Sequence, residues 1–442
     1  MLELLSADSL VSVFKQCEQA AHIIIGYSGG VDSHVLLHVC ANHPAFKNKL
    51  TAVYVHHGLQ TEADAWAEHC AKITTQLGVE FKVLRVNASP AQGESPEEAA
   101  RNARYSALKT LVAKDAVLLV AQHREDQLET VLLQLFRGSG LKGLSGMPEA
   151  ITFSKGQLLR PFLNVSKQTI DSYAVENALT WITDPSNFSN DYDRNFLRNE
   201  VLPLLKQRWP ACDKTVSRSA KHCAEAQTLI SEQAHELFSQ VYNVIDKTLS
   251  ITQLISLDIA KQDLVIREWF KLLGYKMPSA AFVKRLRAEV VLARQDSDPI
   301  LTGAGYTVRR YRDKLYCLTS DTPETIQKIV WPTGESSVNV SERQVLELVN
   351  ANAGISFDQW QQSIVTVQAR KGGEKLRLPN RTGRHALKDL FQEAGIPPWE
   401  RELTPLIYLN EELVAVGDLW ISADYYQVSS SYPYVKLKLS NV

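Results

Sequence analysis

GYSGGVDSHVLL, residues 26–37, is the stretch from which the fold of the first half of the chain can be inferred. It follows three consecutive isoleucines and has Gly29 and Gly30 side by side in front of a helix-like run. A glycine-rich turn between a strand and a helix brings backbone N–H groups close to an anion, and the helix N-terminus adds unpaired donors. Ser28 and Ser33 add hydroxyl donors. The stretch predicts a phosphate-binding turn, although two glycines alone would also serve a plain strand-to-helix turn.

Spacing excludes the two most common phosphate loops. A P-loop has a lysine before its last hydroxyl residue, where this chain has Asp32, and the dinucleotide motif needs separated glycines. Asp32 would repel a phosphate unless a divalent cation lay between them, so the stretch predicts Mg²⁺. SGGVDS resembles the signature of the PP-loop ATP pyrophosphatases, which cleave ATP between the α- and β-phosphates. The resemblance implies that ATP is bound by six consecutive residues, Ser28, Gly29, Gly30, Val31, Asp32 and Ser33.

The composition is that of an ordinary globular protein. The chain has 442 residues, enough for two or three domains, and 45% of them are hydrophobic. The net charge of −1 gives no overall signal for nucleic acid, so a polyanionic partner must be bound by a local basic patch. Six scattered cysteines without a C-x-x-C pair, no signal-peptide pattern and no apolar run of ~20 residues predict a reduced, cytoplasmic protein with no membrane partner.

Short β-rich runs alternate with amphipathic runs up to about residue 121, which predicts an α/β fold with a parallel, doubly wound sheet. Ligands of such sheets bind beyond the carboxyl ends of the strands, where strand order reverses. The expected strands are 22–27, 51–56, 81–86 and 116–121, and the expected helices are 33–41, 62–77 and 96–113. Further along, we expect helices at 214–237 and 257–273 and a strand or hairpin at 306–318.

The stretch AQHREDQLET, residues 121–130, leaves the fourth strand and enters a helix. His123 lies at the strand end, and Asp126 and Glu129 are three residues apart on one helix face. Carboxylates in a first helical turn often only compensate the helix dipole. Beside an ATP site, the three residues become candidates for holding a metal ion, binding a substrate amine or accepting a proton.

Two pairs of arginines have helical spacing. Arg101 and Arg104 lie about one turn apart and could neutralise the charge that develops during displacement at a phosphate. Arg194 and Arg198 lie four residues apart after a stretch rich in Asn and Asp. They form either exposed charges on a capped helix or a basic ridge that contacts RNA phosphates.

The C-terminal segment holds a local basic patch. Seven basic residues fall within nineteen positions that contain one acid, Glu374, and they are Arg370, Lys371, Lys375, Arg377, Arg381, Arg384 and Lys388. A solvated loop could carry such charges. The neighbouring glycines and the stretch EAGIPPWERELTPL are more typical of a compact module with an anion-binding edge.

Together these blocks resemble the tRNA(Ile)-lysidine synthetase family over most of the chain. The segment from RKGGEKL to the final PL resembles the family's C-terminal tRNA-binding module. The family often has Asp or Asn before a His-Gly-Leu triplet and Arg after it, where this chain has His56 and Gln60. The family commonly has a second His before the histidine that aligns with His123, where this chain has Gln122. In order, the blocks are SGGVDS, HHGL at 56–59, E-x-x-x-R-x-x-R-Y at 97–105, H-x-x-D-x-x-E-T at 123–130, RGSG at 137–140, D-x-S-N at 184–187 and R-N-x-x-R at 194–198.

The resemblance implies a ligase that acts on the wobble cytidine of an isoleucine tRNA with a CAU anticodon. The C2 oxygen of the cytidine attacks the α-phosphate of ATP, and free L-lysine then displaces AMP to form lysidine. The implied catalytic residues are Asp32, Arg101, Arg104, His123, Asp126 and Glu129, with Mg²⁺ held by Asp32 and Asp126. The implied tRNA-binding residues are Arg194, Arg198, Arg370, Lys371, Lys375 and Arg377.

Trp209-Pro210 and a loop-like stretch at 321–334 predict two domain boundaries. With the resemblance, they predict a PP-loop ATP-binding catalytic domain at 1–209, a mainly helical central domain at 210–322 and a small α+β tRNA-binding domain at 323–442. A homodimer is compatible with the sequence, which does not define the oligomeric state. Two alternatives stay open. A tRNA thiolase of the same superfamily would need reactive cysteines, and none of the six stands near the motifs in a suitable pattern. A non-catalytic tRNA-binding factor would not need the acidic residues of the motifs.

Overall fold

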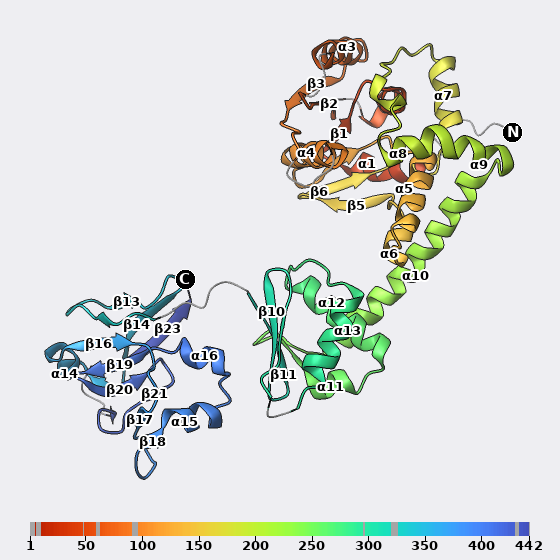
Figure 1. Ribbon diagram of the computed structural model, residues 1–442. Coiled ribbons are helices and arrows are strands. Elements are labelled where there is room, and N and C mark those ends of the chain that lie inside the picture. Colours follow the sequence, from red (N-terminus) through yellow and green to blue (C-terminus); the bar gives the residue numbers. More distant parts are fainter. Residues whose placement is uncertain are drawn as a thin grey trace. The chain divides into compact units, whose positions relative to one another are not determined.

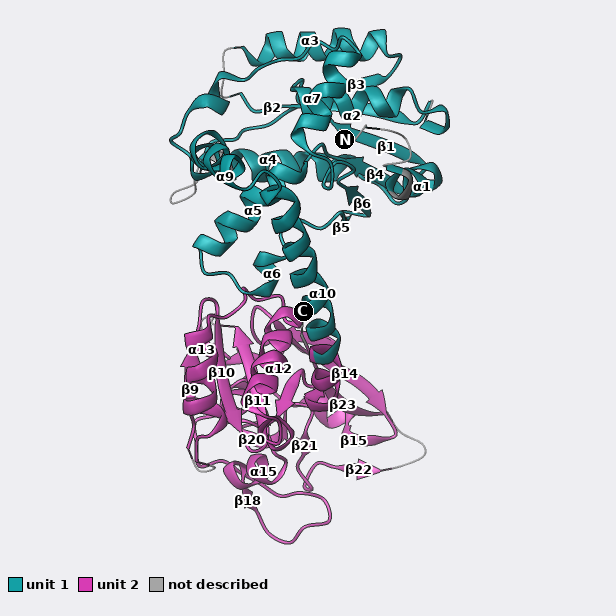
Figure 2. Ribbon diagram, turned by 90° about the vertical axis from the view of Figure 1, so that its right-hand side faces the viewer, with its two compact units in different colours: residues 1–233 teal, residues 234–442 magenta. Residues whose placement is uncertain are grey.

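The computed structural model describes residues 5, 10–46, 48–58, 62–90, 96–294, 297–319, 326–428 and 433–441 (Figure 1). The chain forms two compact units, residues 1–233 and residues 234–442 (Figure 2). Gln60 and the expected domain boundary at 322/323 lie outside the described residues, and the division into three domains stays a prediction. Within the described ranges, no helix is both long and apolar enough to cross a bilayer.

Unit 1 is built on a six-stranded sheet with the order β3-β2-β1-β4-β6-β5. Neighbouring strands are parallel except for the antiparallel β5–β6 hairpin at one edge. In sheet order, the strands span Glu80–Arg85, Leu50–His56, His22–Gly26, Ala116–Leu119, Gly156–Leu159 and Ala150–Phe153. The parallel sheet and its four expected strands are confirmed, whereas the alternation pattern gave no indication of the β5–β6 hairpin.

Helices cover both faces of this sheet because the side chains of β1 alternate between two cores. Ile23 and Ile25 point into a core that includes residues of α1, α2 and α7, and Ile24 points into a core with Leu108 of α4. The helices that begin in unit 1 are α1 (Val11–Gln19), α2 (Val31–Ala41), α3 (Ala63–Gln76), α4 (Pro96–Leu111), α5 (Arg124–Phe136), α6 (Leu141–Leu144), α7 (Lys167–Glu176), α8 (Asp193–Phe196), α9 (Leu202–Arg208) and α10 (Cys212–Val241), with short turns η2 (Pro44–Phe46), η3 (Pro185–Phe188) and η4 (Leu197–Val201).

The direction of strand order changes at β1, which pairs with β2 on one side and with β4 on the other. β1 leads into α2, and β4 leads into α5. In a doubly wound sheet this arrangement leaves a crevice beyond the carboxyl ends of the two strands. The two chemical motifs, at 26–37 and at 121–130, meet at that crevice.

The first part of unit 2 combines helices with a five-stranded antiparallel sheet, β7-β8-β11-β10-β9. Leu249, Val308 and Leu315 of the sheet share a core with Trp269 and Phe270 of α12. The two helices expected after residue 213 and the β10–β11 hairpin are confirmed. The elements are β7 (Tyr242–Asn243), β8 (Thr248–Ser250), α11 (Ile251–Ile255), α12 (Ile259–Leu272), α13 (Ala280–Arg285), η5 (Leu286–Val291), β9 (Ile300–Thr302), β10 (Tyr306–Tyr311) and β11 (Lys314–Thr319).

The rest of unit 2 is a small α+β assembly, as expected. Its sheets have the orders β12-β16-β19-β20-β21 and β13-β14-β23-β15-β22, with a separate β17–β18 ladder. Trp331, Trp360, Val367 and Leu437 belong to its core. The elements are β12 (Ile329–Val330), β13 (Ser337–Asn339), β14 (Gln344–Ala351), β15 (Ala353–Ser356), α14 (Phe357–Gln362), β16 (Val365–Gln368), β17 (Lys375–Leu376), β18 (His385–Ala386), α15 (Leu387–Glu393), α16 (Pro398–Glu402), β19 (Leu406–Leu409), β20 (Glu412–Val416), β21 (Trp420–Ile421), β22 (Gln427–Val428) and β23 (Tyr434–Asn441).

Candidate active site

The turn between β1 and α2 has the geometry of an anion-binding loop. Gly29 has a φ of +83°, and a Cβ at this position would lie 2.6 Å from Cδ1 of Ile182, so the turn requires glycine. The backbone N–H of Ser28 donates to Oγ of Ser33 (3.2 Å), and the Ser33 hydroxyl donates to the carbonyl oxygen of Gly30 (3.0 Å). α2 begins directly after Gly30, and its first N–H groups have no partner within the helix. The turn is therefore held rigid beside donors that suit a phosphate.

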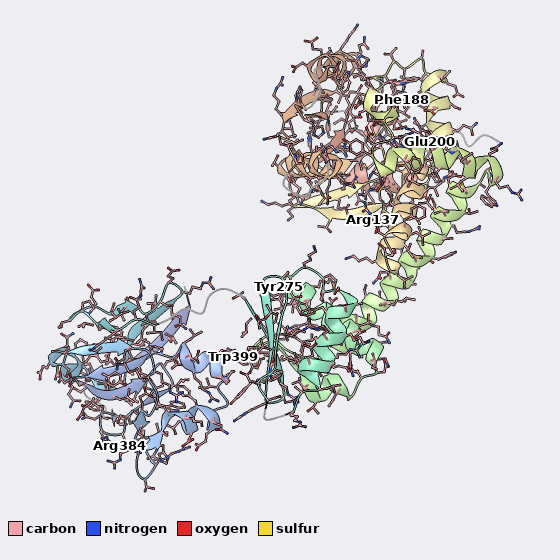
Figure 3. All side chains as sticks on the ribbon, viewed as in Figure 1. Arg137, Phe188, Glu200, Tyr275, Arg384 and Trp399 are labelled. Atoms are coloured by element: carbon pink, nitrogen blue, oxygen red, sulfur yellow. The ribbon has the colours of Figure 1, made fainter. Side chains whose placement is uncertain are left out.

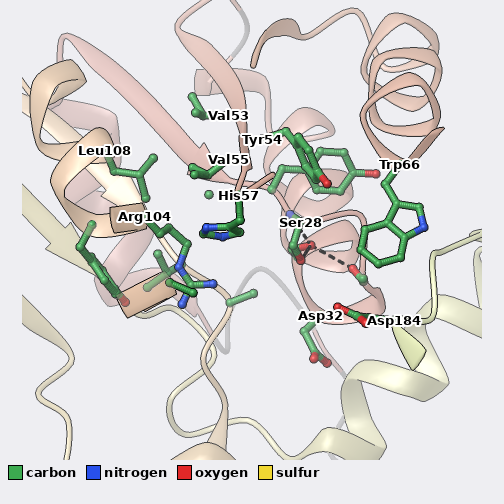
Figure 4. Close-up of a pocket in the computed structure, with 18 of the residues that line it drawn as sticks. Ser28, Asp32, Val53, Tyr54, Val55, His57, Trp66, Arg104, Leu108 and Asp184 are labelled. Atoms are coloured by element: carbon green, nitrogen blue, oxygen red, sulfur yellow. Dashed lines mark hydrogen bonds between the residues drawn. The ribbon is translucent and has the colours of Figure 1, made fainter. Parts of the chain in front are cut away.

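A cavity of about 490 Å³ opens at this turn (Figure 4). Val53, Val55 and Leu108 form an apolar part of its lining, while Ser28 and Asp32 form a polar part (Figure 4). The cavity lies at the carboxyl ends of β1, β2 and β4, where the fold predicts a ligand. It therefore offers an apolar surface for a flat ring and a polar end for charged groups.

Asp32 lies in the first turn of α2, and its carboxylate is held by a lysine. Lys167, the first residue of α7, donates from Nζ to Oδ1 of Asp32 (2.8 Å) and to Oδ1 of Asp171 (2.7 Å). Burial would lower the pKa of Lys167, but the charge of Asp32 and the hydrogen bond with Asp171 outweigh it and raise the pKa. The motifs do not single out Lys167. A cation in a first helical turn opposes the helix dipole, and that conflict is the sequence signal that could have identified it.

Three carboxylates surround the imidazole of His123, which is only 4% exposed. Its Nε2 lies 3.8 Å from Oδ2 of Asp32 and 3.5 Å from Oδ2 of Asp126, and its Nδ1 lies 3.2 Å from Oε2 of Glu125. Burial would lower the pKa of His123, but the charge of Asp126, the hydrogen bond with Glu125 and the charge of Asp32 outweigh it and raise the pKa. Asp32 and Asp126, from two separate motifs, thus converge on one nitrogen atom.

Glu125 anchors this cluster, although the motifs do not single it out. Its Oε1 accepts a hydrogen bond from Nζ of Lys206 (2.7 Å), and its Oε2 accepts one from the backbone N–H of Lys167 (2.9 Å). Burial would raise the pKa of Glu125, but the hydrogen bonds with His123 and Lys206 outweigh it and lower the pKa to about 2. Glu125 is therefore an ionised carboxylate that fixes the orientation of the His123 ring.

Arg194 and Arg198 contact the carboxylate cluster, which neither interpretation of their spacing included. Arg198 donates from Nε and Nη2 to the two carboxylate oxygens of Glu129 (2.7 and 2.9 Å), and Nη2 also donates to Oδ1 of Asp126 (2.7 Å). Nε of Arg194 lies 3.3 Å from Oε2 of Glu129. Helical spacing shows that the two arginines share a helix face, but it does not show what that face contacts. The sequence alone therefore could not identify Glu129 and Asp126 as their partners.

Glu129 lies behind the cavity and does not belong to its lining. Its side chain is fully buried, and its bidentate pair with Arg198 has the geometry of an ionised carboxylate and a guanidinium. Burial raises the pKa of Glu129, and the charge of Arg198 opposes that rise. The contacts of Glu129 are those of a positioning residue, which differs from the expectation that it could bind a substrate amine.

The two arginines of α4 differ in their access to the cavity. Arg104 lines it, and its label in Figure 4 lies across the cavity from Ser28. Both guanidinium groups stack on Tyr105, with Cζ of Arg101 at 5.0 Å and Cζ of Arg104 at 5.6 Å from the ring centroid. Of the pair, Arg104 is therefore the residue that can meet a phosphate in the cavity.

The sequence indicated no cysteine near the motifs in a pattern suited to sulfur transfer, but Cys70 lies beside the turn between β1 and α2. Its Sγ would be 3.0 Å from a Cβ at Gly29. The thiol is buried, and burial raises the pKa of Cys70 to about 12 against the opposing hydrogen bond with Tyr27. A protonated, buried thiol is a poor nucleophile, so this cysteine does not favour sulfur transfer.

The basic patch of the C-terminal segment lies in unit 2, around β17. Nε of Arg370 lies 3.5 Å from Oε2 of Glu374, and its guanidinium stacks 5.8 Å from the ring centroid of Phe391. Oε1 of Glu374 accepts hydrogen bonds from the N–H groups of Lys371 (2.6 Å) and Gly372 (2.9 Å). Arg370 thus shapes the loop. The exposed basic side chains are Lys371, Lys375, Arg377, Arg381, Arg384 and Lys388, of which Arg384 is labelled in Figure 3.

A family model for the PP-loop domain matches residues 3–205, so fold and site define a PP-loop protein. Models described as the TilS substrate binding domain and the TilS substrate C-terminal domain match residues 249–316 and 365–434. The tRNA(Ile)-lysidine synthase of Methylococcus capsulatus is 38% identical over 405 residues, which cover 91% of this chain and 92% of that protein. That of Coxiella burnetii is 36% identical over 402 residues, covering 90% and 88%. The chain therefore belongs to the tRNA(Ile)-lysidine synthase family, as its motifs predicted.

Two solved structures are also similar to parts of the chain. A U34-tRNA thiolase of Methanococcus maripaludis has a TM-score of 0.41 at 15% identity, covering 49% of this chain and 78% of that chain. A TILS C-terminal domain has a TM-score of 0.20 at 18% identity, covering 26% and 91%. The family assignment rests on the sequence matches and not on these low scores.

Proposed function

We propose that this chain joins L-lysine to C2 of the wobble cytidine in an isoleucine tRNA with a CAU anticodon, converting ATP to AMP and pyrophosphate. The observation that carries the proposal is the convergence of Asp32 and Asp126 on His123 beside the Gly-Gly turn. It is supported by 38% identity to a tRNA(Ile)-lysidine synthase over 91% of the chain. A non-catalytic factor would have no need of this cluster.

In the first step, the C2 oxygen of the cytidine attacks the α-phosphate of ATP, the bond to the β-phosphate breaks and pyrophosphate leaves. The hydroxyls of Ser28 and Ser33 and the first N–H groups of α2 would hold the phosphates. Arg104 would neutralise charge on the α-phosphate during the displacement. The apolar lining that includes Val53 and Leu108 suits the adenine ring.

Asp32 and Asp126 would hold Mg²⁺ together with phosphate oxygens. They fit this ion because Mg²⁺ commonly takes only one or two carboxylates from a protein and completes its shell with phosphate and water. Bound there, Mg²⁺ would neutralise the leaving pyrophosphate. Lys167 and Arg198 would keep the two carboxylates oriented.

In the second step, the lysine amine attacks C2, the bond between C2 and the adenylate oxygen breaks and AMP leaves. The amine must be neutral to attack. The groups that can accept its proton are the carboxylates of Asp32 and Asp126, which lie beside the His123 imidazole. Glu125 and Glu129 would position His123 and Arg198 without contacting the substrates.

A single-turnover experiment separates the two steps. The full chain is mixed with Mg²⁺, the CAU tRNA and ATP labelled in its α-phosphate. Without lysine, the label should transfer to the tRNA as pyrophosphate is released, and added lysine should then release labelled AMP. AMP release that depends on a sulfur donor and not on lysine would support the thiolase alternative and contradict the proposal.

A further inference from the structure

A second cavity, of about 810 Å³, lies in unit 1 against a different face of α5. Asp126 of α5 lines the nucleotide cavity, whereas Arg124 and Gln127 line the second one. The remainder of the lining comes from α6, from the loop 145–149, from Leu163 and Asn164, and from α10. We call this cavity the α10 groove.

The α10 side of the groove is basic. Lys214, Arg218 and Lys221 follow one another at helical spacing, all line the groove and all are exposed. Lys142 of α6 adds a fourth positive charge to the lining. Among the described residues that line the groove, Glu149 supplies the acidic group, and it accepts a hydrogen bond from the side chain of Asn164.

Three of these four positive side chains form no ion pair with an acid among the described residues. Within the described part of the chain, no carboxylate forms an ion pair with Lys142, Arg218 or Lys221. By contrast, Arg377 and Arg381 in the C-terminal patch pair with Asp424 and Glu393. Because a row of positive charge along one helix face matches a row of phosphates, the α10 groove is complementary to a nucleic-acid backbone.

The groove is tied to the catalytic helix. Nε2 of Gln127 donates to the carbonyl oxygen of Met147 (2.9 Å), and the Met147 N–H donates back to Oε1 of Gln127 (2.7 Å). Nη1 of Arg124 lies 3.5 Å from Oδ2 of Asp213, next to Lys214 at the start of α10. A helix with its side chains is about 10–12 Å across, so the groove and Asp126 are separated by about that distance.

We propose that the α10 groove binds the sugar–phosphate backbone of the anticodon arm of the tRNA. The inference rests on the proposed function, in which the wobble base enters the nucleotide cavity. With that base beside Asp126, the nucleotides that meet the face of α5 with Arg124 and Gln127 belong to the same arm. The basic face of α10 would then hold the arm by phosphate contacts, which position an RNA without reading its sequence.

The test is a double charge reversal, Arg218→Glu with Lys221→Glu, in the full chain. The matched control is Lys72→Glu with Lys155→Glu, which makes the same change in net charge at exposed positions of unit 1 outside the groove. Affinity is measured at several salt concentrations for the whole tRNA and for a hairpin of its anticodon arm. We expect the groove variant to bind both RNAs about tenfold more weakly. We also expect the slope of log affinity against log salt concentration to become less steep by about 2, since each lost phosphate contact reduces that slope by about 1. The control should stay within about twofold of the unmodified chain.

Affinities of the groove variant and the control that agree within about twofold would overturn the inference. An equal loss for a hairpin of the acceptor arm would overturn the assignment to the anticodon arm and point to general anion binding. Lysidine formation by the unmodified chain is measured in parallel. If lysidine forms and the groove variant binds like the control, only the groove inference fails. If no lysidine forms, the proposed function fails whatever the groove variant does.

Discussion

Each ionised side chain at the site is oriented by an opposite charge from a distant part of the chain. Lys167 holds Asp32 although 135 residues separate them, and Arg198 holds Asp126 across 72 residues. Such pairs limit the motion of the carboxylates, so the groups that we propose to meet the substrates are preorganised. At the scale of the residue, the two acids that hold Lys167 differ in one respect: Asp32 lines the cavity and Asp171 does not belong to its lining.

Asp32→Asn should lower the rate of pyrophosphate release by at least about 100-fold, because the change removes a charge that acts on the reacting phosphates while keeping the size of the side chain. The measurement is single-turnover pyrophosphate release with saturating ATP and tRNA. Asp171→Asn is the matched control, since it removes the other partner of Lys167, and it should stay within about threefold. Equal losses in the two variants would show that Asp32 acts only by holding Lys167.

Glu125→Gln should destabilise the protein in a pH-dependent way. The pKa of Glu125 is lowered from 4.5 to about 2, so its ionised form stabilises the folded state above pH 4.5, and this contribution is lost as the pH falls toward 2. At neutral pH the loss is on the order of 3 kcal/mol. Denaturation midpoints of the ligand-free protein at pH 7 and below pH 4 measure it, with the exposed Glu176→Gln of α7 as control. A loss of stability in Glu125→Gln that is as large below pH 4 as at pH 7 would contradict this account.

At the scale of the element, the turn between β1 and α2 depends on the backbone of Gly29. Gly29→Ala should destabilise the protein by about 1–3 kcal/mol and weaken ATP binding, because a Cβ would be strained at a φ of +83° and would meet Ile182. Gly78→Ala is the matched control. Gly78 also has a positive φ, +64°, but nothing lies within 4 Å of a Cβ there. Thermal denaturation and ATP titration should show that only Gly29→Ala affects the nucleotide.

The four parallel strands of unit 1 and the helices between them were predictable because local pattern specifies them, whereas the β5–β6 hairpin was not. Alternating apolar runs give the four parallel strands, and the Gly-Gly turn and His123 mark the ends of the first and fourth. The partners of the site residues were not predictable. Lys167 reaches Asp32 because α7 packs into the core beside β1, and Lys206 reaches Glu125 because α9 packs on α5. Spacing put Arg198 on a helix face but could not show that this face contacts Glu129 and not solvent.

At the scale of the whole molecule, the net charge of −1 means that tRNA affinity must come from local basic surfaces. Each compact unit has one: the α10 groove in unit 1 and the exposed lysines and arginines around β17 in unit 2. Unit 2 also carries the matches to the two TilS substrate domains. Two separate sites allow an RNA to be held at two places along its length, which raises affinity through effective concentration.

Lys371→Glu with Lys375→Glu should weaken binding of the whole tRNA about tenfold and leave the KM for ATP unchanged. Both side chains are exposed in unit 2, whereas Arg370 is tied to Glu374 and Phe391 and its loss would disturb the loop. Lys276→Glu with Lys328→Glu is the matched control, because these lysines are exposed elsewhere in unit 2. Salt-dependent tRNA titrations give the result, and an affinity like that of the control would exclude these two lysines from the tRNA surface.

The most direct test of the central claim is the mass of the wobble nucleoside after the full chain has acted on an isoleucine tRNA. The reaction contains ATP, Mg²⁺ and L-lysine, and a second tRNA that differs only in its anticodon serves as the comparison. We predict that the wobble cytidine of the CAU tRNA gains lysine with the loss of water, with AMP and pyrophosphate formed in equal amounts, and that the second tRNA is unchanged. A CAU tRNA whose wobble cytidine keeps its mass while ATP is consumed would contradict the account.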